Sequence, residues 1–233
     1  MKEDKTLQII SCGPGLSAIN AKYGRSSEWV RDIARNKISN IKIVNIYEGD
    51  FPSCRSNDVW IITGSRYSVY DKIDWIKSFT KHIKTGVQNK VPMLGICFGH
   101  QILCNALGAD VVNNQAGWEI GSSRVQLTEK GKSSRLFKGI DSNFTVYQSH
   151  HDVVDSVPSN IEVLAINQYG IQSFSYSDYI FGVQFHPEFS FNVMKAYHSI
   201  RIKKIDNGKE YFVHDENDGA EVIDNFIDMI LRR

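Results

Sequence analysis

The sequence has little of what would place it in several large classes of protein. Its 27 Lys and Arg nearly balance its 26 Asp and Glu, and a net charge of +1 gives no reason to expect binding to nucleic acid or to an acidic membrane surface. No run of roughly 18 apolar residues is present, so no membrane span is expected. Residues 1–6 are polar and lack the apolar stretch of a secretory signal, which predicts a cytoplasmic protein.

Cysteines are few and irregularly placed. The sequence holds four of them, without a CxxC pair: Cys12, Cys54, Cys97 and Cys104. This spacing favours neither a disulfide framework nor a zinc site, and it suits a reducing compartment. His150 and His151 precede Asp152, but adjacent His side chains point apart in most backbones and no second cluster supports a metal site. We therefore expect neither a metal nor another cofactor.

Short β-branched runs alternate with helical patterns through the first 110 residues, which predicts an α/β fold. Strands separated by helices form crossover units, so we expect a three-layer, mostly parallel open sheet with helices on both faces. The predicted strands of this part are 7–11, 41–46, 59–63 and 91–96, and the predicted helices are 26–38, 73–83 and 102–107.

The pattern changes after residue 110, where short strand candidates follow one another between turn residues. We expect some of them to extend the same sheet in antiparallel fashion. A final helix follows, for which Asp218 and Glu221 have the spacing of a capping box. Residues 205–218 before it are polar and predict an exposed hairpin or loop. No repeat, low-complexity segment or linker is present, so we predict a single domain over residues 1–233. The strand candidates are 111–112, 123–127, 144–146, 162–165, 170–174 and 180–184.

A cysteine stands between two glycines where a predicted strand meets a predicted helix, in Gly95-Ile-Cys97-Phe-Gly99. Such a turn holds a nucleophile in strained backbone, and the flanking glycines let neighbouring chain approach closely. The helix that follows points its N-terminus at the thiol and favours the thiolate, and its free amides suit a developing oxyanion. The alternative is that Cys97 is a small buried apolar residue, as most single cysteines are.

A cysteine nucleophile needs a base, and the base needs a group that orients it. Phe185-His186-Pro187-Glu188 offers both directly after a predicted strand. His186 is placed to take the thiol proton and to return it to the leaving group, and Glu188 to hold the imidazole in the right tautomer. Alone, this stretch is also an ordinary turn. It gains weight because both strand ends lie where an open α/β sheet places its active site.

Gly95-Ile-Cys-Phe-Gly-His-Gln101 together with Gln184-Phe-His-Pro-Glu188 resembles the class I, triad-type glutamine amidotransferases. The stretches 61–65, 68–71, 117–121 and 149–152 add further matches. The resemblance is close over residues 40–190, and it is strongest to free-standing members related to the amidotransferase domain of GMP synthase, including the γ-glutamyl peptidase type. It implies a flavodoxin-like fold and no cofactor.

The resemblance also implies an activity. Cys97 would attack the γ-amide of glutamine or another γ-glutamyl bond, with His186 as base and acid and Glu188 as its orienting group, to form a γ-glutamyl thioester that water hydrolyses. By the same resemblance, the backbone amides of Gly64 and Phe98 would form the oxyanion hole. The family's glutamyl-binding positions correspond here to Gln101, Tyr147, Gln148, Ser149 and His150.

The sequence departs from the family in three places. Arg66 stands where free-standing relatives often carry proline, and it either meets a substrate carboxylate or lies in solvent. His151 stands where relatives commonly have glycine. Residues 199–217 are longer than a minimal member needs.

Three functions remain open at this point. The first is a glutaminase that delivers ammonia to a synthetase on a separate chain, because the sequence holds no Gly-rich phosphate loop and no second catalytic motif. The second is a free-standing γ-glutamyl peptide hydrolase with the same residues. The third is a catalytically silent binding or regulatory protein, for which an intact Cys97, His186 and Glu188 would have no chemical use.

Overall fold

One large sheet organises the chain in the computed structural model, which describes residues 5–205 and 209–233. Its nine strands, within these described residues, are β1 (Thr6–Ser11), β2 (Asn40–Asn45), β3 (Asp58–Ile62), β4 (Met93–Ile96), β6 (Glu119–Leu127), β7 (Asn143–His150), β9 (Glu162–Asn167), β10 (Gly170–Tyr176) and β11 (Ile180–Val183). They lie in the order β2-β1-β3-β4-β11-β10-β9-β6-β7.

The sheet has a parallel half and an antiparallel half that meet at β11. β2, β1, β3, β4 and β11 run parallel to one another. From β11 outward, each pair of neighbours through β10, β9, β6 and β7 is antiparallel. A separate antiparallel pair joins β5 (Asp110–Asn113) to β8 (Asp152–Ser156). The predicted fold class, with its antiparallel extension, is confirmed.

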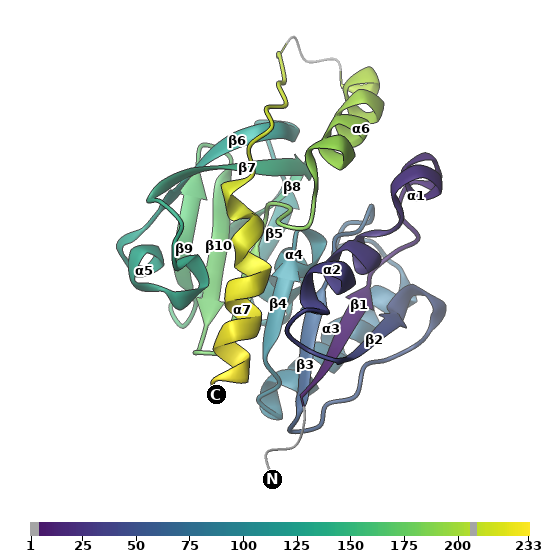
Figure 1. Ribbon diagram of the computed structural model, residues 1–233, viewed down its shortest axis with the longest axis vertical. Coiled ribbons are helices and arrows are strands. Elements are labelled where there is room, and N and C mark those ends of the chain that lie inside the picture. The colour runs from purple at the N-terminus through teal and green to yellow at the C-terminus, as the bar shows by residue number, and fades with distance from the viewer. Residues whose placement is uncertain (1–4, 206–208) are drawn as a thin grey trace.

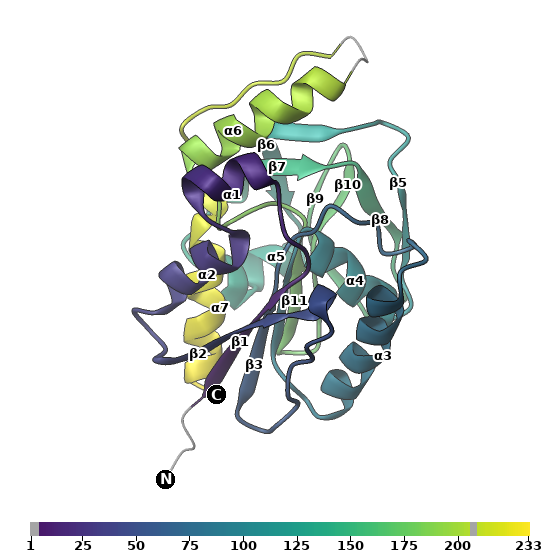
Figure 2. The same cartoon turned by 90° about the vertical axis from the view of Figure 1, so that its right-hand side faces the viewer.

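Helices cover both faces of the parallel half (Figures 1 and 2). On one face lie α2 (Ser26–Ala34) and α7 (Glu221–Leu231), and on the other α3 (Asp74–Gln88) and α4 (Phe98–Ala106). The remaining α-helices are α1 (Ser17–Tyr23), α5 (Glu129–Ser133) and α6 (Phe191–Arg201). None of the helices formed by the described residues combines the length and the apolar character that crossing a membrane requires.

The strand β1 shows why the parallel half reads as an apolar run. All six of its residues are buried, and successive side chains enter opposite layers. Ile9 belongs to the core cluster that contains Val30 of α2, whereas Ile10 belongs to the cluster that contains Phe79 of α3. Each helix meets the sheet with one apolar stripe, so two cores form on the two sides of a single sheet.

The capping box predicted for the last helix is wrong. The Asp218 carboxylate accepts a hydrogen bond from the backbone amide of Thr145 in β7 at 2.8 Å, and α7 starts only at Glu221, after a 3₁₀ turn. The local spacing was that of a cap, but an unpaired amide of the sheet holds the carboxylate instead. Asp218 therefore ties the start of the helix to β7.

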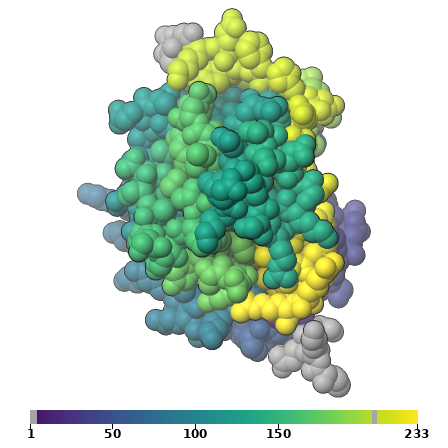
Figure 3. Space-filling view, turned by 90° about the vertical axis from the view of Figure 1, so that its left-hand side faces the viewer, coloured from purple at the N-terminus to yellow at the C-terminus, as the bar shows by residue number. Residues whose placement is uncertain are grey.

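The stretch before this helix is bound to the sheet. Residues 206–208 of the predicted loop 205–218 lie outside the described residues. Residues 209–217, which we call the strap, run beside β6 at one end of the antiparallel half (Figure 3). The Ser122 amide donates to the Phe212 carbonyl at 2.8 Å, and the His214 amide donates to the Ser122 hydroxyl at 3.0 Å. The strap is neither a strand nor a free loop.

Gly99→Ala tests the close contact between α4 and the sheet. A Cβ at Gly99 would overlap the carbonyl oxygen of Ile62 in β3, so α4 or β3 must move. We expect the free energy of unfolding to fall by about 1–3 kcal/mol, measured by urea denaturation. In the control Gly13→Ala, the nearest added contact is the rotatable Ser65 hydroxyl at 3.3 Å, and we expect a smaller effect. Equal effects of the two changes would contradict the account of this contact.

Candidate active site

Three adjacent parallel strands end at the same place, and each is followed by a residue that the sequence singled out. Gly64 follows β3, Cys97 follows β4 and His186 follows β11. A Cβ on Gly64 would lie 3.2 Å from Cε1 of His186 and 3.6 Å from Cβ of Cys97, so the three residues are in contact. The carboxyl ends of parallel strands are where open α/β sheets form their sites.

Cys97 occupies the sharp turn that its neighbours predicted. Its backbone has φ of 53° and ψ of −103°, in a region that residues other than glycine rarely adopt. The amide of Cys97 donates to the Val183 carbonyl at 2.9 Å, which holds the turn against β11. The side chain lies directly before α4, where the positive end of the helix favours a thiolate.

His186 and Glu188 form a buried pair. Nδ1 of the imidazole lies 2.9 Å from Oε1 of Glu188, and both residues are only 5% exposed. Burial disfavours the imidazolium, but the Glu188 carboxylate and Cys97 outweigh burial and raise the pKa of His186 well above its usual range. Because Glu188 holds Nδ1, Nε2 is the nitrogen left for the hydrogen bond with Cys97. This arrangement suits a thiolate beside an imidazolium.

Two residues that the sequence analysis missed fix this pair in place. The Ser26 hydroxyl at the start of α2 donates to Oε1 of Glu188 at 3.1 Å. The ring of Phe189 stacks on His186, with ring centres 4.0 Å apart and an angle of 15° between the planes. Phe189 adjoins the predicted motif and was within reach of the sequence argument. A serine at the start of a helix carries no comparable signal.

The strap holds the same turn from behind. The Asn217 side-chain amide donates to the backbone carbonyls of His186 at 3.2 Å and Phe189 at 3.3 Å. The Tyr147 hydroxyl donates to the His214 carbonyl at 2.9 Å. The stretch that exceeds a minimal family member thus supports the turn that carries the candidate base.

A pocket beside Cys97 collects some of the predicted glutamyl-binding residues. We call it the Gln101 pocket, and its lining includes Gln101, Trp118, Ser149, His150, Asp152 and Arg201. The Ser149 hydroxyl is buried and has no hydrogen-bond partner among the described residues. Tyr147 and Gln148 do not line this pocket: the first bonds to the strap, and the second donates to Gln172 at 2.6 Å. We place these two behind the site.

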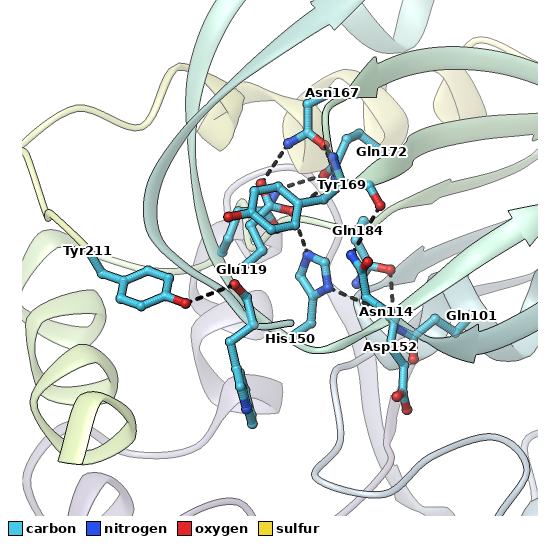
Figure 4. Close-up of polar contacts among 12 residues, drawn as sticks. Gln101, Asn114, Glu119, His150, Asp152, Asn167, Tyr169, Gln172, Gln184 and Tyr211 are labelled. Carbon is cyan, nitrogen blue, oxygen red and sulfur yellow. Dashed lines mark hydrogen bonds and ion pairs between the residues drawn. The ribbon is translucent and has the colours of Figure 1, made fainter. Parts of the chain in front are cut away.

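A buried carboxylate supports the pocket from below (Figure 4). Glu119 accepts from the His150 imidazole at 3.0 Å, from Asn167 at 2.6 Å and from Gln172 at 3.1 Å. Gln101 donates both amide hydrogens to protein acceptors, the Asp152 carbonyl and the Gln184 side chain. Its carbonyl oxygen is therefore the group left to accept a hydrogen bond from a ligand.

Charges of both signs face the Gln101 pocket. The Asp152 carboxylate accepts from Ser68, from Tyr70 at 2.8 Å and from His151 at 2.8 Å, and its hydrogen bond raises the pKa of His151. Arg66 is exposed, yet its guanidinium lines the pocket and packs over Tyr67.

Arg201 was missed by the sequence analysis. It lies at the end of α6, half-buried, with its guanidinium 4.8 Å from the Trp118 ring centre. Its Nε is buried and has no hydrogen-bond partner among the described residues. Its importance comes from tertiary contact, which a cluster of basic residues in the sequence does not indicate.

Glu188→Gln tests the buried pair. The amide carries no charge to favour the imidazolium, so we expect the pKa of His186 to fall by at least about one unit. The measurement is an NMR titration of the histidine rings, with Glu129→Gln as an exposed control. An unchanged His186 titration in Glu188→Gln would contradict the proposed pairing.

Comparisons with known proteins agree with this geometry. The family model for glutamine amidotransferase class-I matches residues 40–201. A glutamine amidotransferase-like protein of Schizosaccharomyces pombe is 34% identical over 73% of this chain and 65% of its own length. For a glutamine-hydrolyzing GMP synthase subunit of Saccharolobus solfataricus the values are 38%, 56% and 67%. For gamma-glutamyl peptidase 4 of Arabidopsis thaliana they are 26%, 64% and 62%. The chain thus spans about two thirds or less of the length of these relatives.

Solved structures share the fold. A glutamine amidotransferase of Thermotoga maritima has a TM-score of 0.70 at 22% identity, over 98% of this chain and 95% of that one. One of Methylobacillus flagellatus has a TM-score of 0.72 at 18% identity, over 98% and 94%. The predicted resemblance is confirmed, and the chain belongs to the class I glutamine amidotransferase family.

Proposed function

We propose that this chain hydrolyses the γ-amide of glutamine through a γ-glutamyl thioester on Cys97 and releases glutamate and ammonia. The observation that carries the proposal is Cys97 in a strained turn beside the buried pair of His186 and Glu188. Family membership and relatives named as glutamine-hydrolysing and γ-glutamyl enzymes support the same class of reaction.

The thiolate of Cys97 attacks the γ-carbonyl carbon, and the carbonyl electrons move onto oxygen. His186 gives its Nε2 proton to the leaving nitrogen as the C–N bond breaks, which leaves the thioester and ammonia. A water molecule then gives a proton to His186 and attacks the thioester. The C–S bond breaks, Cys97 leaves as thiolate, and glutamate is formed. Glu188 stabilises the imidazolium and keeps Nδ1 turned away from the thiol.

The backbone around Cys97 suits the developing oxyanion. The Phe98 amide lies in the first turn of α4, where it has no acceptor within the helix. Gly64 lies against Cys97 and His186, and its backbone approaches closely because it carries no side chain. Two amides aimed at one oxygen stabilise the tetrahedral intermediate without charged residues. We assign the oxyanion hole to Gly64 and Phe98.

The Gln101 pocket suits the amino-acid part of the substrate. Glutamate attached through its γ-carbon carries an ammonium and a carboxylate at the other end. The carbonyl oxygen of Gln101 and the Asp152 carboxylate favour the ammonium, and the Arg201 guanidinium favours the carboxylate. Ser149 offers a hydroxyl without a protein partner at the same pocket. Gln101, Ser149 and His150 therefore remain the glutamyl-binding residues that we propose.

A separate synthetase is the acceptor of ammonia in this proposal. Several relatives are named as one subunit of GMP synthase, and that name makes each of them one part of a larger enzyme. The present sequence holds no Gly-rich phosphate loop with which to activate an acceptor. We propose that any such step belongs to another chain.

Cys97→Ala tests the reaction. We expect glutamate release from L-glutamine to fall about a thousandfold or more, since loss of a nucleophile removes the covalent route. The measurement is enzyme-coupled detection of glutamate from purified protein, with circular dichroism to confirm folding. Cys54→Ala is the matched control, because Cys54 lies outside both pockets that border Cys97. Cys97-independent release, or no release from glutamine and γ-glutamyl amides, would overturn the proposal.

A further inference from the structure

Two pockets meet at Cys97. One is the Gln101 pocket. The other, which we call the His186 pocket, opens between the loop after β1 and the start of α2, and its lining includes Ser11, Asn20, Arg25, Gly64, His186 and Tyr197. Both pockets share Ser65, Arg66, Cys97, Ser149 and Arg201. Cys97 thus separates two binding spaces rather than closing the end of one.

The position of the acid decides which space takes the leaving group. His186 lines the His186 pocket and not the Gln101 pocket. A general acid must lie within hydrogen-bond reach of the atom that it protonates. The leaving nitrogen therefore enters the His186 pocket while the glutamyl part occupies the other.

The His186 pocket is larger than ammonia requires. It encloses about 630 Å³, a volume in the range of small-molecule sites. Its N-terminal wall contains Leu16 and the polar residues Asn20, Ser26 and Ser27. This space suits a leaving group that has a body of its own.

The charged lining residues of this pocket are of one sign. Arg25 and Arg66 lie exposed at the pocket, Arg201 is half-buried, and no Asp or Glu is among the described residues that line it. None of the three guanidinium groups forms an ion pair with a carboxylate in the described part of the chain. Arg25 only reaches the Tyr47 hydroxyl, at 3.5 Å. Unpaired guanidinium groups around a pocket favour an anionic group within it.

We propose that the His186 pocket is a leaving-group subsite for amines that carry a carboxylate, that is, amino acids or short peptides joined to the γ-carboxyl of glutamate. This inference rests on the proposed function, and it adds a substrate class to glutamine. The bond broken is the γ-glutamyl C–N bond, the amine leaves with the proton of His186, and water completes the hydrolysis as for glutamine. Arg25 and Arg66 bind the carboxylate of the leaving amine.

Arg25 is the residue that tests the subsite, because it lines the His186 pocket alone, whereas Arg66 and Arg201 line both. The substrates are γ-glutamyl-alanine and γ-glutamyl-alaninamide, which differ in the charge of the leaving group. For the native protein we expect kcat/KM to be about tenfold or more higher for the free carboxylate, the effect of one charge-assisted contact. In Arg25→Gln we expect this ratio to fall to about threefold or less.

Arg35→Gln is the matched control, since it removes the same charge from an exposed position just after α2 and outside the pocket. We expect it to keep the native ratio. A native ratio near one, or equal ratios in Arg25→Gln and Arg35→Gln, would overturn the subsite.

Binding separates the subsite from the chemistry. Calorimetric titration of Cys97→Ala with the two dipeptides reports on the pocket without turnover. Tighter binding of γ-glutamyl-alanine, lost in Cys97→Ala combined with Arg25→Gln, supports the subsite even if the native protein hydrolyses nothing, an outcome that overturns the proposed function alone. Cys97-dependent glutaminase activity with no preference between the dipeptides in either measurement overturns the subsite alone.

Discussion

The left-handed backbone of Cys97 is the constraint on which the site depends. A residue other than glycine at φ of 53° persists only where its surroundings hold it, and here the holding contacts are specific. The Cys97 amide is bound to β11, and Gly95 and Gly99 allow α4 to approach the sheet too closely for any side chain. The same contacts that force the strain also point the thiol out of the sheet. Packing of α4 and reactivity of Cys97 are therefore one feature of the fold.

The site lies where the parallel half of the sheet ends. β4 and β11 are neighbours, so the thiol and the imidazole follow adjacent strands although 89 positions separate them in the chain. Beyond β11 the sheet becomes antiparallel, and β6 and β7 supply the walls of the Gln101 pocket and the anchor points of the strap. The parallel half thus carries the chemistry, and the antiparallel half shapes the space beside it and holds the His186 turn.

Much of the fold was predictable because buried strands and amphipathic helices leave strong periodic patterns. The elements that the sequence analysis missed leave weak ones: α1 buries only Ile19, α6 buries only Val193 and Met194, and α5 has five residues. Asp218 looked like a helix cap because local spacing cannot show that a strand amide competes for it.

The candidate site divides in the same way. Cys97, His186 and Glu188 stand in short motifs whose geometry is local, and the structure brings them together. Ser26 reaches Glu188 across 162 positions, and Asn217 reaches His186 across 31, so neither contact has a local pattern. Arg201 became visible only when α6 was seen to end beside both pockets.

Covalent labelling tests the central claim most directly. A glutamine analogue with an electrophile at the γ-carbon is mixed with the native protein, and the modified residue is identified by mass spectrometry of the peptides. The account predicts one label per chain, on Cys97, with protection by excess glutamine. Labelling of Cys12, Cys54 or Cys104 instead, or no labelling of Cys97, would contradict it.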